Sequence, residues 1–155
     1  MTHEDFMREA IMLAEDSVRR GGGPFGAVVV RGGEVIARGS NSVTLLNDPT
    51  AHAEVNAIRS ACAAEGAFKL DGCDLYTSCE PCPMCLSAAY WAGIRTIYYG
   101  ADRNDAAAAG FDDSFIYSQI ALEPSARKIP SVNILHGAAK APFALWQETA
   151  DKTEY

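Results

Sequence analysis

Two short segments of the sequence restrict the fold more than any other feature: His52-Ala53-Glu54 and, further along the chain, Pro81-Cys82-Pro83-Met84-Cys85. Cys82 and Cys85 are three positions apart, so at a helix start both sulfurs can converge on one ion. Pro83 stands at a favoured first-turn position, and the exposed N–H groups of a helix start stabilise the thiolate that zinc requires. His52 supplies a third, nitrogen ligand. The chain must therefore fold so that two distant segments meet at one metal ion.

Glu54 lies two positions after His52, a spacing that separates two side chains on the body of a helix. Both can share a site only if the site lies off the helix end, and we expect a helix that starts near Thr50 to place them in its first turn. The zinc would then lie between two helix N-termini. Three protein ligands leave one coordination position open, as in catalytic zinc sites. Glu54 is then placed to move protons as a general acid-base.

A structural zinc site or an iron-sulfur cluster would use the same cysteines differently. A structural site needs a fourth ligand, and the candidates are Cys62, Cys73, Cys79, His3 and His136. Cys79 is the main concern because Cys79, Cys82 and Cys85 are evenly spaced, although we expect it to end a strand and face the core. An iron-sulfur cluster lacks an obvious fourth cysteine. Five cysteines without an export signal favour metal or redox chemistry over a disulfide framework.

The composition fits one domain that acts on a small molecule. With 155 residues, 48% of them hydrophobic, the chain suits a single domain over residues 1–155, of which about 138–155 form a C-terminal tail. The net charge of −7 argues against a nucleic-acid groove, which needs a basic footprint. No apolar run approaches the length of a membrane span, and no signal peptide is recognisable, so we expect a cytoplasmic location.

Hydrophobic periodicity and turn residues predict an α/β domain. Residues 4–20 have the period of an amphipathic helix, which Gly21-Gly22-Gly23-Pro24 ends. Gly32-Gly33 predicts a two-residue hairpin between strands at 25–30 and 34–38. Further helices are expected at about 50–65, capped by Asp48 or Thr50, at 83–91, and from Pro142 to near Tyr155. Further strands are expected at 75–77, 95–99 and 132–135. This order gives a three-layer α/β/α fold with a mixed five-stranded sheet.

Beyond the metal motif, the chain resembles the cytidine deaminase superfamily and, over nearly its whole length, the small bacterial guanine deaminases within it. His-x-Glu followed by Pro-Cys-x-x-Cys is the signature of zinc deaminases. Segments 23–27 and 47–55 are similar to those of relatives that act on bases, nucleosides or transfer RNA. The narrower resemblance, which carries the substrate prediction, lies in Ala109–Tyr117, with Phe111-Asp112-Asp113-Ser114-Phe115, and in the final Glu154-Tyr155.

The resemblance implies a cytidine deaminase-like fold, one Zn²⁺ per chain, and hydrolysis of guanine to xanthine and ammonia in purine catabolism or salvage. It also implies a homodimer whose C-terminal segments exchange, so that one tail covers the partner's site. The substrate contacts that it implies are a hydrogen bond from Asn41, orientation of the base by the backbone of Ala53, and packing by Phe25 and Trp91. It also implies a contact from Asp113 that assists proton transfer, and closure of the pocket by the hydroxyl or terminal carboxylate of Tyr155.

Each of these substrate contacts has a simpler alternative. Asn41 follows a strand and could be a turn residue, and Phe25 and Trp91 have apolar neighbours and could fill the core. Asp112 or Asp113 could cap a helix that begins near Ser114. Tyr155 ends the chain, where residues are usually frayed.

Other functions fit part of the pattern. Deamination of guanosine or of an aminotriazine needs the same chemistry, because it requires only an aromatic C–NH2 carbon beside a ring nitrogen. Transfer-RNA adenosine deamination is less favoured, since residues 141–155 carry Glu148, Asp151 and Glu154 against only Lys152. A non-catalytic zinc-binding module would not need Glu54, and a redox protein would not need zinc.

Overall fold

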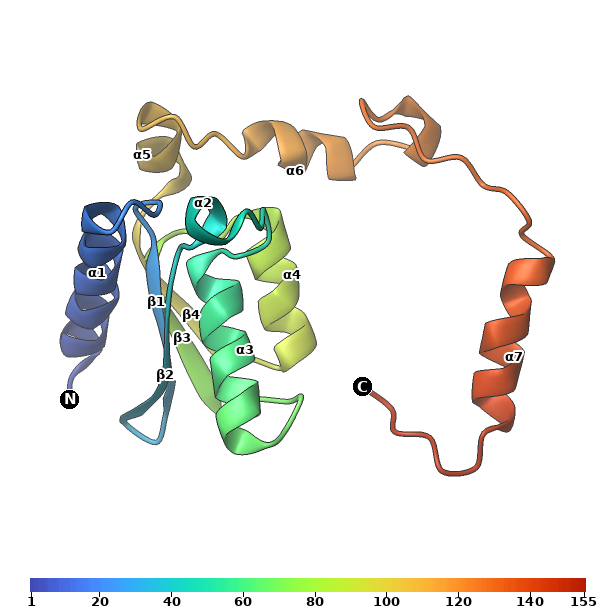
Figure 1. Ribbon diagram of the computed structural model, residues 1–155, viewed down its shortest axis with the longest axis horizontal. Helices are drawn as coiled ribbons and strands as arrows, with labels where there is room; N and C mark the ends of the chain where they lie inside the picture. Colours follow the sequence, from blue (N-terminus) through green and yellow to red (C-terminus); the bar gives the residue numbers. More distant parts are fainter. The chain divides into compact units, whose positions relative to one another are not determined.

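The chain forms two units, Met1–Asp113 and Ser114–Tyr155, in the computed structural model, which describes residues 1–155 (Figure 1). The first unit is built on a sheet of four strands in the order β2-β1-β3-β4. They are β1 (Gly26–Arg31), β2 (Glu34–Ser40), β3 (Cys73–Cys79) and β4 (Thr96–Ala101). β1 pairs antiparallel with β2 and with β3, whereas β3 pairs parallel with β4. The sheet is mixed, as the order of elements predicted.

The predicted fifth strand at 132–135 is wrong, and the sheet has four strands. Residues 131–134 are neither helical nor extended in a ladder, and Leu135 has a φ of 54°, in the left-handed region. A short apolar run matches the pattern of a strand, but a strand also needs a neighbour that pairs with its backbone groups. This segment belongs to the second unit, which contains no strand.

Helices cover both faces of the sheet, which confirms the three-layer α/β/α arrangement (Figure 1). On one face, α1 (His3–Arg19) packs against β1 and β3. On the other face, α3 (Ala53–Glu65) packs against β2 and β1, and α4 (Pro83–Ala92) contacts α3. The sheet therefore positions the start of α3 and the start of α4 on the same side.

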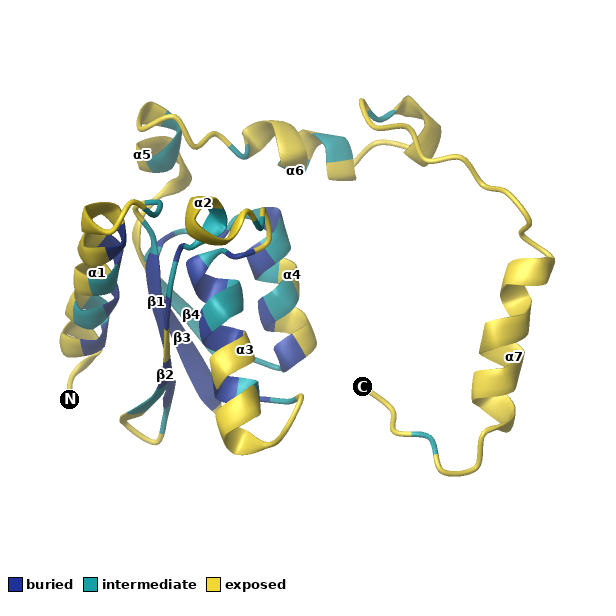
Figure 2. Cartoon of the chain, viewed as in Figure 1, coloured by how far each residue is buried: buried dark blue, intermediate teal, exposed yellow.

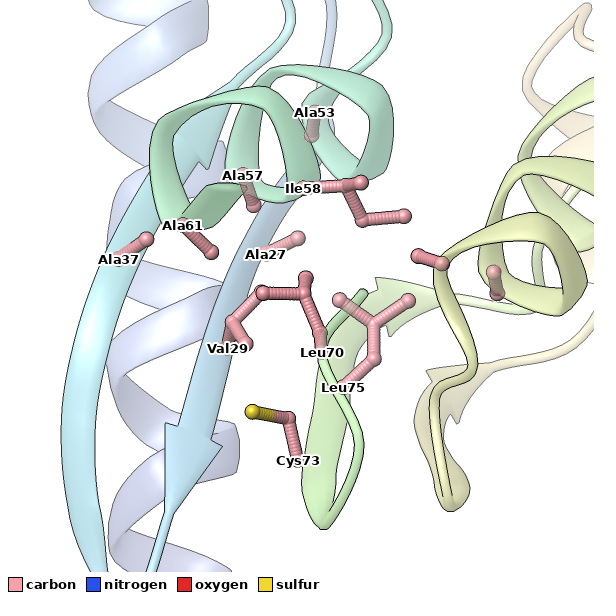
Figure 3. Close-up of a cluster of buried hydrophobic side chains, with 12 residues drawn as sticks. Ala27, Val29, Ala37, Ala53, Ala57, Ile58, Ala61, Leu70, Cys73 and Leu75 are labelled. Atoms are coloured by element: carbon pink, nitrogen blue, oxygen red, sulfur yellow. The ribbon is translucent and has the colours of Figure 1, made fainter. Parts of the chain in front are cut away.

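Strand β1 is buried on both faces, because its residues alternate between two hydrophobic clusters. Val28 and Val30 pack with Phe6 and Tyr76 beneath α1. Ala27 and Val29 pack into the larger cluster beneath α3 and α4 (Figure 3). This cluster consists of Ala27, Val29, Ala37, Ala53, Ala57, Ile58, Ala61, Leu70, Cys73, Leu75, Ala89 and Ala92. Small alanines dominate this second cluster, so α3 lies close to the sheet.

Three glycines explain one turn and one close contact that the fold needs. The predicted hairpin is confirmed, with Gly32 and Gly33 at φ of 59° and 87°, as a type I′ turn requires. At Gly39 on β2, an added Cβ would overlap the backbone of Ala53 and Ala57. Gly39 therefore allows the first turn of α3 to sit directly on β2.

The second unit has helices but no core. It contains α6 (Ser114–Ile120), the 3-10 turns η1 (Pro124–Ala126) and η2 (Ala138–Lys140), and α7 (Ala141–Glu148). No residue of this unit is buried, and Figure 2 shows it mostly yellow. The terminal helix predicted to reach Tyr155 ends at Glu148, since Thr149 is extended at φ −72° and ψ 117°.

Helix α1 confirms the first predicted helix almost to the residue. Two short helices of the first unit, α2 (Val43–Leu46) and α5 (Arg103–Ala108), were not predicted, because each is too short to show a hydrophobic period. None of the helices combines the length and the apolar character that crossing a bilayer demands.

Candidate active site

The start of α3 and the start of α4 bring the three predicted ligands together. His52 is the N-cap of α3, and Cys82 is the N-cap of α4, with Cys85 one turn further on. The Nδ1 of His52 lies 3.5 Å from the Sγ of Cys82 and 3.5 Å from the Sγ of Cys85. All three ligand atoms lie within 4.8 Å of one another. The geometry predicted from the spacing, a site between two helix N-termini, is confirmed.

The helix start itself differs from the prediction. The helix at 50–65 was expected to be capped by Asp48 or Thr50, but α3 begins at Ala53. The Oδ1 of Asp48 accepts hydrogen bonds from the backbone N–H of Thr50 at 2.8 Å and from its hydroxyl at 2.7 Å, which closes a turn before the helix. The side chain of His52, as N-cap, makes no capping hydrogen bond, so it is free to face the cysteines.

The distances fit zinc. Tetrahedral zinc with bonds of about 2.3 Å to sulfur and about 2.0 Å to nitrogen separates those two atoms by about 3.5 Å. The separations between the His52 Nδ1 and the two cysteine sulfurs match this value. Cys79, the strongest candidate for a fourth ligand, points its Sγ at the carbonyl of Asp102 instead, at 3.8 Å. Three ligands remain, and one coordination position is left for water or substrate.

The ligand side chains shift one another's pKa values. The hydrogen bond with the Cys85 thiol, followed by the one with the His52 ring, lowers the pKa of Cys82 to about 4 despite its burial. The contact with Cys82, followed by burial, raises the pKa of Cys85, and the Cys82 thiolate raises the pKa of His52. Zinc binds cysteines as thiolates, so its binding releases the proton of a thiol.

Glu54 lies beside the ligands, deep in the protein. Its side chain is 5% exposed, its Oε1 accepts a hydrogen bond from the hydroxyl of Thr77 at 3.2 Å, and its Oε2 accepts one from the Cys85 thiol at 3.3 Å. Burial raises the pKa of Glu54, against the lowering effect of its own backbone N–H and of Cys85. A carboxyl that can hold a proton in this position is suited to general acid-base chemistry.

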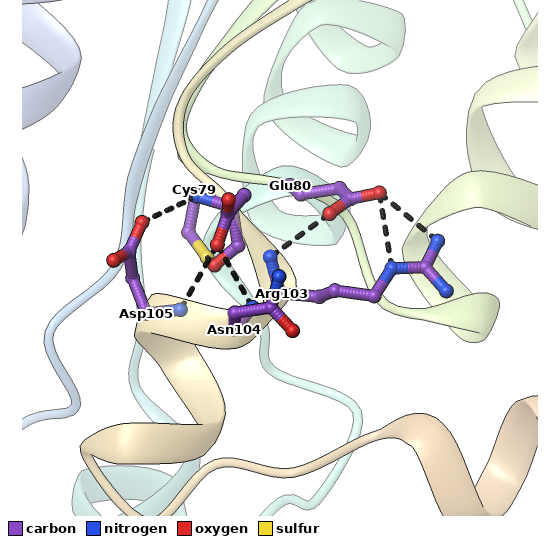
Figure 4. A network of polar contacts seen from close by, with 6 residues as sticks. Cys79, Glu80, Arg103, Asn104 and Asp105 are labelled. Carbon is purple, nitrogen blue, oxygen red and sulfur yellow. Dashed lines mark hydrogen bonds and ion pairs between the residues drawn. The ribbon is translucent and has the colours of Figure 1, made fainter.

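Sequence reasoning missed Thr77 and the link between Glu80 and Arg103. Thr77 is fully buried on β3, and a polar residue at a buried strand position is the signal that could have revealed it. The Glu80 carboxylate accepts from the backbone N–H of Arg103 at 2.9 Å and from its Nε and Nη2 at 3.2 and 2.9 Å (Figure 4). This pair fastens the segment before Cys82 to the start of α5.

Five of the six predicted substrate residues lie in the same unit as the metal ligands. Asn41 is 7% exposed, directly after β2, and Ala53 is buried as the first residue of α3. Phe25 is half-buried and packs edge to face on Phe111, with ring centroids 5.0 Å apart. Their proximity to a bound base stays a prediction.

Asp113, Trp91 and Tyr155 occupy different surroundings. Burial raises the pKa of Asp113, followed by the negative charge of Cys82, so this carboxyl is within electrostatic reach of the ligand set. Trp91 lies in the last turn of α4, about 13 Å along the helix from Cys82, and is 64% exposed. Tyr155 is 77% exposed and belongs to the second unit. Nothing in the single chain places Trp91 or Tyr155 on a substrate, and both roles stay predictions.

Comparison with known proteins settles the family. Residues 1–101 match the model of the cytidine and deoxycytidylate deaminase zinc-binding region. The chain belongs to this family. This family binds zinc, and His52, Cys82 and Cys85 form a group that can hold it, which favours zinc over an iron-sulfur cluster at these cysteines.

Individual members of the family differ in how much of this chain they match. The guanine deaminase of Bacillus subtilis is 54% identical over the full length of both chains, and its X-ray structure superimposes with a TM-score of 0.98, covering 100% of this chain and 99% of that one. A tRNA-specific adenosine deaminase of Agrobacterium fabrum is 50% identical but covers 62% of this chain and 63% of its own. A guanine deaminase structure from Nitrosomonas europaea is 35% identical, with a TM-score of 0.69, over 72% of this chain and 65% of that one.

Proposed function

We propose that this deaminase hydrolyses guanine to xanthine and ammonia. The observation that carries the proposal is the similarity to a guanine deaminase over the whole chain, including residues 114–155, which lie beyond the zinc-binding region. The match to the tRNA-specific relative covers only 96 residues, fewer than the first unit contains. The part of the chain outside the shared catalytic region therefore favours a purine base.

Glu54 carries the proton transfers of the proposed reaction. Zinc held by His52, Cys82 and Cys85 supplies an electrophilic centre that makes water acidic near neutral pH. Glu54 takes a proton from the attacking water, whose oxygen forms a bond to C2 of guanine. It delivers this proton to the ring nitrogen, takes the second proton from the hydroxyl now bonded to C2, and passes it to the amine, so that the C2–N bond breaks, the C2 carbonyl forms and ammonia leaves. Thr77 holds one oxygen of Glu54 during these transfers.

Substrate recognition requires polar groups that match the edges of a flat, neutral purine. We assign hydrogen bonds to Asn41 and to the backbone N–H of Ala53, which as a first-turn N–H has no partner within the helix. Phe25 packs on the base, and Asp113 contacts the amine and assists proton transfer. Trp91 and Tyr155 complete the pocket, and their exposure in the single chain is consistent with a role that a second subunit brings about.

That second subunit is part of the proposal. The chain acts as a homodimer in which the C-terminal segment, about residues 138–155, exchanges so that one tail covers the partner's site. The exposed apolar side chains of α7, Phe143, Leu145 and Trp146, supply the surface that such an exchange would bury. A cytoplasmic role in purine catabolism or salvage accompanies this assignment.

Guanosine and aminotriazines are the alternative substrates, because the same zinc site can attack any comparable C–NH2 carbon. Transfer RNA is a weaker alternative, since the net charge is −7 and the tail adds Glu148, Asp151 and Glu154. Closure by Tyr155 favours a free base over a nucleoside, whose sugar would need an exit.

An ammonia-release assay on zinc-quantified protein tests the proposal. Guanine, guanosine, adenine, cytosine, cytidine and an aminotriazine are offered side by side. Release from guanine with about one zinc per chain is the expected result. Preferential release from guanosine or from the aminotriazine would keep the zinc chemistry and refute the substrate assignment. Zinc-loaded protein that is inactive on all of them would refute both the substrate and the catalytic role of Glu54.

A further inference from the structure

Asn41 has almost all of its hydrogen-bonding groups occupied by the protein. Its backbone N–H donates to the carbonyl of Phe25 at 3.0 Å, and its own carbonyl accepts from the hydroxyl of Ser17 at 2.9 Å. Its side-chain Oδ1 accepts from the backbone N–H of Gly23 at 3.3 Å and of Val43 at 3.2 Å. The Nδ2 amino group alone has no partner within the chain. Because no buried side-chain nitrogen or oxygen lacks a partner, the Nδ2 must reach the surface, where it can donate to a ligand.

The two backbone donors determine which way the amide faces. A backbone N–H can donate only to an acceptor, so Gly23 and Val43 fix Oδ1 on their side and turn Nδ2 away from them. Asn41 therefore offers a donor to the substrate, and the atom opposite it must be an acceptor. A guanine base presents two acceptors on one edge, O6 and N7.

Ser17, on α1, fixes the backbone of Asn41 through its hydrogen bond to the Asn41 carbonyl. It is fully buried, and its hydroxyl would be costly to bury without the bond to the Asn41 carbonyl. A Cβ added at Gly22 would lie 2.5 Å from the Ser17 Oγ and 2.5 Å from the Asn41 oxygen. The glycines after α1 thus do more than end the helix, because Gly22 leaves the space in which Ser17 reaches Asn41.

We propose that Ser17 is a positioning residue for substrate recognition, which presents the Asn41 amino group to an acceptor atom of the purine. The inference rests on the proposed function for its substrate, but its geometry is that of the free protein. Ser17 belongs to α1, the layer on the opposite face of the sheet from the zinc ligands. Its effect on the reaction therefore passes through Asn41 and not through the metal.

The loop around Asn41 has a second, independent support. The Nδ2 of Asn56 on α3 donates to the carbonyl of Ser40 at 2.8 Å and to the hydroxyl of Ser42 at 2.9 Å. The residues on both sides of Asn41 are therefore held from α3 even without Ser17. Removal of the Ser17 hydroxyl is expected to free Asn41 locally while the loop, the zinc site and the fold persist.

The test is a double-mutant cycle of Ser17→Ala and Asn41→Ala. Ser17→Ala is expected to lower kcat/KM for guanine about tenfold, mainly through KM, as the loss of one well-placed hydrogen bond predicts. In the Asn41→Ala background the same substitution should change kcat/KM by less than about twofold, because the two act as one unit. Ser40→Ala is the matched control, since its hydroxyl also contacts a carbonyl of α1, that of Leu13 at 3.4 Å, and not Asn41.

Base analogues and product binding extend the cycle. If Asn41 donates to O6, the effect of Ser17→Ala on kcat/KM should vanish with 2-aminopurine, which lacks O6. If Asn41 donates to N7, the effect should vanish with 7-deazaguanine, which lacks N7. Xanthine keeps both O6 and N7 and is not deaminated. Its dissociation constant, measured by calorimetry for the same four proteins, repeats the double-mutant cycle without turnover. Equal losses on guanine and both analogues, additive effects of the two substitutions, or loss of zinc in Ser17→Ala would each overturn the proposal. A protein that does not deaminate guanine would refute the proposed function alone, while the xanthine cycle still decides the role of Ser17.

Discussion

The two units of the chain differ in where their apolar side chains lie: the first unit packs many of them into a core, and the second buries none of them. In the first unit, Met1–Asp113, the hydrophobic residues form two clusters on the two faces of one sheet, and every buried residue of the chain lies there. The second unit, Ser114–Tyr155, leaves all its large apolar side chains at least partly exposed, among them Phe115, Ile120, Phe143, Leu145 and Trp146. Exposed apolar side chains in such number are typical of interaction surfaces, which supports the proposed exchange of this segment.

The two units also differ in their expected roles, because the catalytic residues lie in the first unit and we expect substrate preference to depend on the second. The metal ligands, Glu54 and Thr77 all lie in the first unit, within residues 1–101 that match the family model. The second unit lies beyond that match. The first unit therefore contains the deaminase chemistry that relatives with other substrates share, and the second unit is where we expect the purine-specific part of the enzyme.

Removing a zinc ligand gives the largest effect. Cys85→Ala removes one of three protein ligands, and we expect both the bound zinc and the ammonia release to fall to background. Metal analysis and the ammonia assay check this, with Cys62→Ala, a half-buried cysteine outside the site, as the matched control. Full zinc content in Cys85→Ala would show that the ligand assignment is wrong.

Glu54→Gln separates chemistry from metal binding. The amide keeps the size of the side chain and its contact with Thr77 but cannot cycle a proton, so kcat should fall about 10²–10⁴-fold. Zinc content should stay near that of the unchanged protein. Glu34→Gln, an exposed carboxylate on β2, is the control and should leave kcat unaltered. An active Glu54→Gln protein would favour a non-catalytic use of zinc.

How far the sequence predicts this site follows from the kind of signal each residue gives. His52, Cys82 and Cys85 are rare residue types in a motif, and chemistry alone requires them to meet, so their positions could be predicted before the fold. Thr77 and Ser17 are common residues whose importance depends on contacts with distant residues. Sequence spacing carries no information about such contacts.

The fold shows the same limit. The hairpin at Gly32-Gly33 and the long helix α1 are determined by local residues, and both were predicted correctly. The strand predicted at 132–135 depended on a distant neighbour for its backbone hydrogen bonds, and the local pattern could not supply one. The predicted cap at Asp48 or Thr50 was wrong because the Asp48 side chain closes a turn with Thr50 instead, and α3 begins only after His52.

Two leucines test the contrast in burial directly. Leu75 on β3 is fully buried, and Leu75→Ala should lower the free energy of unfolding by about 2–5 kcal/mol. Leu145 on α7 is 68% exposed in the single chain, and Leu145→Ala should change the unfolding of the isolated chain by less than about 0.5 kcal/mol. Denaturant unfolding at several protein concentrations measures both. If the tail is covered by a second copy, the effect of Leu145→Ala will depend on protein concentration.

Shortening the tail tests whether the second unit contributes to the reaction. Deletion of residues 152–155 removes Tyr155 and no buried residue, so unfolding of the first unit should be unchanged. We expect kcat/KM for guanine to fall about tenfold if Tyr155 closes the pocket, since each lost contact is worth on the order of 1 kcal/mol. Tyr155→Phe distinguishes the hydroxyl from the ring. A truncated enzyme with unchanged kinetics would remove the tail from the substrate site.

The smallest effect is expected at the Glu80–Arg103 pair, which supports the segment before Cys82 from the surface of the first unit. The pair is partly exposed, and such pairs contribute only about 0.2–1 kcal/mol, so Arg103→Gln should weaken unfolding stability by no more than that and leave zinc content intact. The hydrogen bond from Arg103 lowers the pKa of Glu80, so this stabilisation is present above the ordinary carboxyl pKa of about 4.3 and is lost as the pH falls through the lowered value. The stability difference between the two proteins should therefore be full at neutral pH and disappear in strong acid. A stability difference that persists in strong acid would mean that Arg103 acts through packing. A loss of zinc in Arg103→Gln would mean that the ion pair contributes more to the position of the segment before Cys82 than a surface ion pair is expected to.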